Sequence, residues 1–138
     1  NTVAEFHVHT SLKIPEGIIN GDNNMHIDRF LPNMKIYFSP NDLNQNNAPF
    51  CYALGSHKIT NKYLEFVKSS KFFSEKEVIE TEPFLKYKKE ITCKANTVVV
   101  ALTNGFHGRK PFLEELKRNV IFLQYHKSYN KISLLFKK

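Results

Sequence analysis

Three side chains in this sequence are of the types that bind a catalytic metal ion, namely His26, Asp28 and His107. His26 and Asp28 are two residues apart, and side chains at that spacing point to the same side of an extended chain. His107 follows much later, in a short stretch that contains Gly105 and Gly108. Two imidazoles and one carboxylate on one face of a metal ion leave three positions open, which suits non-haem iron(II). We therefore predict that these three residues are the metal ligands, and we expect no catalytic residue beyond them.

The open positions on such an ion can take a 2-oxo acid and O₂. The far carboxylate of 2-oxoglutarate would then need a buried cation, and arginine offers two parallel hydrogen bonds where lysine offers one point charge. Arg118, 11 residues after His107, is the candidate for this clamp. Tyr37, on the strand predicted after Asp28, can point toward the same co-substrate, and Arg109 is a further candidate cation.

Short strands separated by turn residues must position these side chains. A helix N-cap is predicted at Thr60, followed by a short amphipathic helix to about Ser70. Residues 104–111 are predicted to form a loop. An all-β fold with a minor helix, a sandwich or a barrel-like double sheet, follows from this pattern. The predicted strands, rich in β-branched and aromatic residues and bounded by Gly, Pro and Asn, are residues 3–9, 34–38, 50–54, 90–93, 97–102, 118–125 and 132–136.

Length and composition limit the kind of protein this can be. With 138 residues, of which 41% are hydrophobic, the chain is expected to form one domain, residues 1–138, with a buried core. No run in the sequence approaches the roughly 18 apolar residues that cross a bilayer, so no membrane span is expected. No signal peptide is visible. Cys51 and Cys93 are expected to be reduced thiols, which favours a cytoplasmic location.

Positive charge is concentrated in the later part of the chain. The net charge is +7, and residues 58–138 carry the whole surplus. A basic surface can attract nucleic acid, anionic lipid or a small acidic substrate. Most of the basic residues are scattered lysines. They lack the interleaved aromatic residues on which the bases of single-stranded nucleic acid would stack. We therefore expect a small-molecule substrate, which can be anionic, and not nucleic acid; the charged stretch 58–90 is typical of an insertion or lid.

Five motifs follow one another along the chain, in the order Met25-His26-Ile27-Asp28, Asn47-Ala48-Pro49, Leu54-Gly55-Ser56-His57-Lys58, Gly105-Phe106-His107-Gly108 and Arg118. Together they resemble the phytanoyl-CoA dioxygenase family of iron(II)/2-oxoglutarate-dependent oxygenases over residues 24–125. In that family the corresponding pieces are a metal-binding His and Asp, a turn, a strand end, the second metal-binding His and the arginine that holds the co-substrate. Ala48 and Asn96 stand where that family commonly has glycine, and Arg109 stands where it has a small or hydroxylated residue.

The resemblance implies a double-stranded β-helix, also called a jelly roll, with iron(II) held at its mouth by His26, Asp28 and His107. It implies a dioxygenase that hydroxylates a small molecule while it converts 2-oxoglutarate and O₂ to succinate and CO₂. Family members usually carry a helical segment before the first core strand, and this domain is expected to lack it. Two alternatives stay open at this point: a cupin-like metalloenzyme that does not use 2-oxoglutarate, and a non-catalytic jelly-roll module that binds a sugar or nucleic acid.

Overall fold

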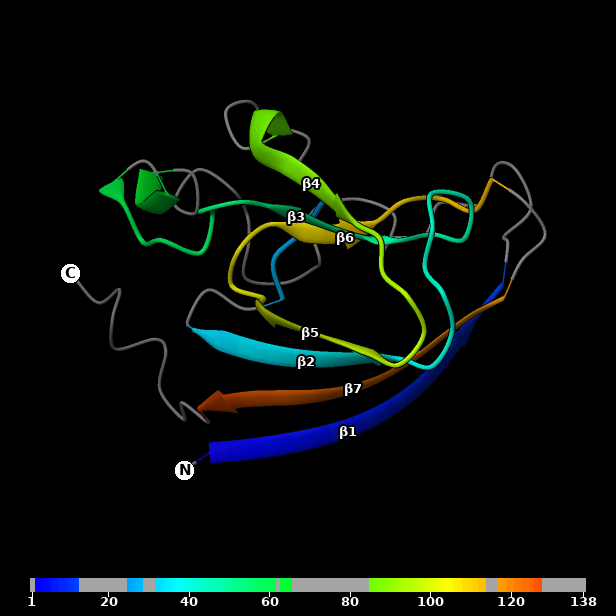
Figure 1. Ribbon diagram of the computed structural model, residues 1–138. Coiled ribbons are helices and arrows are strands. Elements are labelled where there is room, and N and C mark those ends of the chain that lie inside the picture. The colour runs from blue at the N-terminus through cyan, green and yellow to red at the C-terminus, as the bar shows by residue number, and fades with distance from the viewer. Residues whose placement is uncertain are drawn as a thin grey trace.

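Two antiparallel β-sheets face each other in the computed structural model, which describes residues 2–12, 25–28, 32–61, 63–65, 85–113 and 117–127 (Figure 1). The four-stranded sheet has the order β1-β7-β2-β5 and the three-stranded sheet the order β4-β3-β6. A 3₁₀ turn at Leu85–Tyr87 precedes β4. The strands are β1 (Thr2–Ser11), β2 (Asn33–Ser39), β3 (Phe50–Ala53), β4 (Lys88–Ile91), β5 (Thr97–Leu102), β6 (His107–Arg109) and β7 (Arg118–Lys127).

The strands predicted from sequence agree with the observed ones to within two residues at either end, apart from 132–136, which lies outside the described residues. The prediction of a loop over 104–111 was wrong for its central part, because His107–Arg109 form β6. This strand has only three residues and pairs with β3, more than fifty residues earlier, as His107↔Tyr52 and Arg109↔Phe50. A period of two cannot be recognised over three residues, one of which is glycine, so only the pairing reveals this strand.

The predicted helix cap at Thr60 is confirmed within the described residues. The backbone N–H of Tyr63 donates to Thr60 Oγ1 at 3.2 Å, and the N–H of Leu64 donates to the Thr60 carbonyl at 2.9 Å. Beyond residue 65 the predicted helix lies outside the described residues. Most of the stretch 58–90 is also outside them, so its role as an insertion or lid stays a prediction. No helix in the described part of the chain is long and apolar enough to cross a membrane.

The two faces of the four-stranded sheet differ in polarity. Side chains alternate along a strand, and Lys35, Tyr37 and Arg118 point from β2 and β7 into the space between the sheets. The opposite face is apolar and exposed in the described chain, with Phe6 and Val8 both 67% exposed. On β5 the exposed residues of this outer face are Val98, Val100 and Leu102. The four-stranded sheet therefore presents polar side chains to the interior, where a ligand site needs them.

Candidate metal centre

Backbone hydrogen bonds bring the two segments of the predicted site together. The N–H of His26 donates to the carbonyl of His107 at 2.7 Å, and the N–H of His107 donates to that of His26 at 2.8 Å. This reciprocal pair places His26 beside β6 as an isolated antiparallel bridge. The N–H of Asp28 donates to the carbonyl of Thr103 at 3.0 Å. Residues that lie far apart in sequence are thus paired through main-chain atoms at the site itself.

The segment that leads into His107, residues 103–106, is held on several sides, and we call it the positioning loop. The Tyr63 hydroxyl donates to the Asn104 carbonyl at 2.8 Å, and Tyr63 is fully buried. Ser56 Oγ accepts the N–H of Phe106 at 2.8 Å and donates to the carbonyl of Ala53 at 2.6 Å. The serine of the Gly-Ser-His motif therefore fixes the backbone next to the second histidine.

Gly105 is in the positioning loop because no side chain fits there. A Cβ atom at this residue would overlap the hydroxyl oxygen of Tyr52, and it would lie 2.8 Å from Tyr52 Cζ and 2.9 Å from Ser56 Oγ. Tyr52 cannot easily move away, since it is buried and its hydroxyl donates to the Leu102 carbonyl at 2.7 Å. That hydrogen bond joins the two sheets, so the close approach at Gly105 follows from how the sheets are held together.

His26, Asp28 and His107 each offer one ligand atom within 4.8 Å of the other two. Asp28 Oδ1 lies 3.8 Å from His26 Nε2, and Asp28 Oδ2 lies 3.5 Å from His107 Nε2. Both imidazoles are buried. Among the described residues this is the one group of three or more such side chains that could hold a metal ion.

The tautomer of His107 is set by its second ring nitrogen. Nδ1 of His107 lies 2.9 Å from the carbonyl oxygen of Gly105. A carbonyl oxygen can only accept, so Nδ1 carries a proton, and in the neutral imidazole, the form that binds a metal ion, the lone pair is on Nε2, the nitrogen that faces Asp28. A hydrogen bond of this kind is typical of the outer shell of a metal-binding histidine, because it fixes the orientation of the ring and makes the free nitrogen a better ligand. The donor set and its geometry fit a 2-His-1-carboxylate metal site.

Lys35 places a cation directly against Asp28. The ammonium nitrogen lies 2.7 Å from Asp28 Oδ2 and 5.0 Å from the centre of the Phe122 ring. Burial by itself raises the pKa of Asp28, but the hydrogen bond and positive charge of His107 in its protonated form, together with those of Lys35, outweigh burial and hold that pKa well below its usual value. Asp28 is therefore an anion at neutral pH, as a metal ligand must be.

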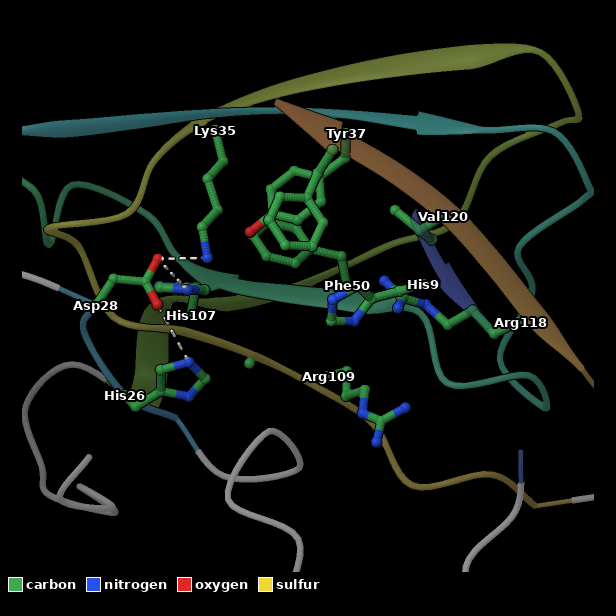
Figure 2. Close-up of a pocket in the computed structure, with 12 residues that line it drawn as sticks. His9, His26, Asp28, Lys35, Tyr37, Phe50, His107, Arg109, Arg118 and Val120 are labelled. Atoms are coloured by element: carbon green, nitrogen blue, oxygen red, sulfur yellow. Dashed lines mark ion pairs between the residues drawn. The ribbon is translucent and has the colours of Figure 1, made fainter. Parts of the chain in front are cut away.

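The triad opens into a cavity of about 130 Å³ between the sheets. Figure 2 shows Lys35 pointing at Asp28 near one end, with Arg118 toward the other. The Tyr37 ring lies in the middle of the wall, 4.9 Å from that of Phe50. Arg118 and Arg109 are both only 8% exposed. The structure thus places Arg118, Tyr37 and Arg109, predicted as co-substrate contacts, around the same cavity as the predicted metal ligands.

His57, His7 and His9 are not part of the triad. His57 lines a second, largely apolar cavity of about 300 Å³. His7 stacks on Phe122 at 4.6 Å between ring centres, and His9 packs against the same ring at 5.0 Å while it lines the first cavity. The ion pair between Lys35 and Asp28 was not predicted from the sequence. The sequence places Lys35 on the same strand face as Tyr37, which was already a candidate, but it does not specify Asp28 as the partner of Lys35.

The fold of this chain is similar to those of several solved structures, among them HygX, EvdO2 and ThoJ. HygX from Streptomyces hygroscopicus has a TM-score of 0.60 and 16% identity, over 93% of this chain and 59% of that chain. EvdO2 from Micromonospora carbonacea var. aurantiaca has a TM-score of 0.59 and 16% identity, over 88% of this chain and 51% of that chain. The non-heme monooxygenase ThoJ has a TM-score of 0.55 and 12% identity, over 87% of this chain and 42% of that chain. HygX has been crystallised with iron bound, and with nickel and 2-oxoglutarate bound.

No family model matches the sequence, and no curated protein matches it either. The structural similarity shows the fold: the predicted all-β jelly-roll core is confirmed. The chain spans between about two-fifths and three-fifths of the length of these three structures.

Proposed function

We propose that this chain is the jelly-roll core of an iron(II)/2-oxoglutarate-dependent oxygenase that hydroxylates a small molecule. One observation carries the proposal: His26, Asp28 and His107 lie together at a cavity whose wall also includes a buried arginine, Arg118. The fold is shared with HygX, which has been crystallised with nickel and 2-oxoglutarate. A metal site alone would fit many enzymes, whereas a metal site and a buried arginine in one cavity fit a dicarboxylic co-substrate.

Each part of the cavity has a role in this proposal. His26, Asp28 and His107 would hold iron(II), and Arg118 would bind the far carboxylate of 2-oxoglutarate through two parallel hydrogen bonds. When bound, iron(II) with 2-oxoglutarate and O₂ supplies the oxidising chemistry, with succinate and CO₂ as by-products. Lys35 keeps Asp28 ionised and restricts its rotation through their ion pair. The rings of Tyr37 and Phe50 line the cavity and would help to exclude water once the ligands are bound.

The finer assignment, to the phytanoyl-CoA dioxygenase family, is supported by two backbone conformations. Ala48 has a φ of 57° and Asn96 a φ of 61°. Both values lie in the left-handed region that glycine favours. These are the two positions where that family commonly has glycine, so this chain keeps the expected backbone shape although its residues differ. Arg109 stands where that family has a small or hydroxylated residue. This difference from the family affects the ligand cavity, because Arg109 lines it.

An anaerobic titration of the full chain tests the proposed function. Iron(II) is added first and 2-oxoglutarate second, and the visible absorption of a 2-oxo acid chelated to iron(II) is recorded. Admission of O₂ should then yield succinate, measured by chromatography, even in slow turnover without substrate. The variant His57→Ala is the matched control, because it removes an imidazole that lies away from the triad.

The outcome also separates the alternatives. Binding of iron(II) without any binding of 2-oxoglutarate would favour a cupin-like metalloenzyme. Failure to bind iron(II), nickel(II) or cobalt(II) would contradict the proposal and favour a non-catalytic jelly-roll module.

A further inference from the structure

We propose that Lys35 is a positioning residue that occupies one oxygen of the Asp28 carboxylate, so that Asp28 binds the metal ion through its other oxygen alone. This inference rests on the proposed function and extends it, because it concerns how many positions on the metal ion stay open. The observation that carries it is the ion pair itself. The ammonium nitrogen of Lys35 lies 2.7 Å from Asp28 Oδ2, and the two side chains are only 12% and 10% exposed (Figure 2).

Lys35 is held in place by its strand and by its side-chain contacts. It lies in β2, which is hydrogen-bonded to β7 on one side and to β5 on the other, and there it is paired with Gln124 and Ala101. Its ammonium nitrogen lies 5.0 Å from the centre of the Phe122 ring. A buried cation that loses its partner is strongly destabilising. The ammonium group should therefore keep its contact with Asp28 when a metal ion binds.

The metal ion and the ammonium group of Lys35 would be two cations at one carboxylate. Asp28 Oδ1 lies 3.8 Å from His26 Nε2 and Oδ2 lies 3.5 Å from His107 Nε2, so the carboxylate stands beside both imidazoles. Two cations repel each other, and the repulsion is greater the closer they are. They are therefore better placed on different oxygens than on the same one. With Oδ2 taken by Lys35, Oδ1 is left for the metal ion.

The number of open positions on the metal ion follows from this arrangement. A carboxylate can bind a metal ion through one oxygen or through both. With one oxygen from Asp28 and one nitrogen from each histidine, a six-coordinate ion keeps three positions open, two for the 2-oxo acid and one for O₂. If both oxygens of Asp28 bound, the 2-oxo acid would fill the two positions that remain. Lys35 would thus keep the third position open.

The test compares the affinity for metal with the affinity for 2-oxoglutarate in Lys35→Met. Cobalt(II) is the metal, because its visible absorption depends on its coordination number. Calorimetry measures the dissociation constant of cobalt(II), and then that of 2-oxoglutarate on the full chain loaded with cobalt(II). Without the ammonium group both oxygens of Asp28 can bind, so 2-oxoglutarate should bind about tenfold more weakly. Cobalt(II) affinity should stay the same or rise, because a nearby positive charge is lost, and the visible spectrum should change.

Three further variants complete the test. Lys35→Arg keeps a cation beside Oδ2 and should restore most of the affinity for 2-oxoglutarate. Lys94→Met is the matched control, because Lys94 also pairs with an aspartate, at 2.9 Å from Asp42 Oδ2, but its side chain is 90% exposed. Circular dichroism checks the fold. If Lys35→Met does not fold, Lys35→Gln, which keeps a polar group beside Asp28, is measured with the same expected directions.

Two results would overturn the inference. In the first, Lys35→Met has the cobalt(II) spectrum and both affinities of the unmodified chain. In the second, the affinities for cobalt(II) and for 2-oxoglutarate fall in parallel, which would make Lys35 a general support of the site. Failure of the unmodified chain to bind 2-oxoglutarate would contradict the proposed function instead, and the cobalt(II) spectrum of Lys35→Met would still test how Asp28 binds the metal ion.

Discussion

At one end of the cavity, the ligands are short side chains whose backbone is hydrogen-bonded to a neighbouring segment. At the other end, two long side chains enter the cavity from the ends of strands. The metal end consists of His26, Asp28 and His107, with the reciprocal bond between the two histidine backbones. The arginine end consists of Arg109, the last residue of β6, and Arg118, the first residue of β7.

The difference reflects what each ligand requires. Bonds from a metal to histidine or carboxylate are near 2 Å, and a site holds its ion only if the donors are placed to within a few tenths of an ångström. Backbone hydrogen bonds at the donors supply that precision. A guanidinium group recognises a carboxylate by charge and by a broad fork of donors. Arginine can therefore reach its ligand through a long side chain, and the two functions should be separable by mutation.

The largest effect is expected at the metal end. His107→Ala and His26→Ala should each abolish binding of iron(II) or nickel(II), because two remaining ligands do not hold the ion. Calorimetric titration with metal measures this, and far-ultraviolet circular dichroism checks that the sheets remain folded. His57→Ala should bind metal as the unmodified chain does. If both variants kept their affinity for the metal ion, His26 and His107 would not be metal ligands.

At the arginine end, Arg118→Ala should weaken 2-oxoglutarate binding and spare metal binding. Truncating one partner of a buried charged pair typically costs about 2–5 kcal/mol, which is roughly 30-fold to several-thousand-fold in the dissociation constant. Arg118→Lys should recover only part of this affinity, because one ammonium cannot make two parallel bonds. If Arg118→Ala changed the affinity by less than twofold, Arg118 would not be the clamp and Arg109 would be the next residue to test.

Gly105→Ala asks whether the metal end depends on the positioning loop. The added Cβ would overlap Tyr52 and crowd Ser56, so the loop or the sheet contact must shift. We expect a loss of about 1–3 kcal/mol in the free energy of unfolding. Metal binding should become weaker, and the position of Arg118 should not change. Gly55→Ala is the matched control: its φ is 80°, with nothing within 4 Å of the added Cβ, so it tests backbone strain alone. Equal metal affinity in the two variants would contradict a role for the loop.

Tyr37→Phe should have the smallest effect and tests the middle of the cavity. The ring packing against Phe50 and Phe122 is kept, and only the hydroxyl is lost. If the hydroxyl contacts 2-oxoglutarate, its affinity should fall by about two- to tenfold, the range of a single hydrogen bond of about 0.5–1.5 kcal/mol. An unchanged dissociation constant for 2-oxoglutarate would mean that Tyr37 lines the cavity wall and that its hydroxyl does not contact the co-substrate.

The sequence alone was sufficient for the features that depend on neighbouring residues. The spacing of His26 and Asp28 places both on one side of an extended chain, and the β-rich run 97–102 predicted the bounds of β5 correctly. Thr60 was recognised as a cap because a helix N-terminus needs a nearby oxygen acceptor. In each of these cases the atoms that interact lie within a few residues of each other, so the local pattern contains the information.

The tertiary structure decided the rest. β6 exists because β3 supplies its hydrogen-bonding partners, and Gly105 is required because Tyr52 of another strand occupies the space beside it. The ion pair between Lys35 and Asp28 depends on where β2 lies relative to the segment that carries His26. Hydrogen bonds and ion pairs act over a few ångströms, whatever the distance along the chain, and a pattern within one segment does not specify which distant segment will be its neighbour.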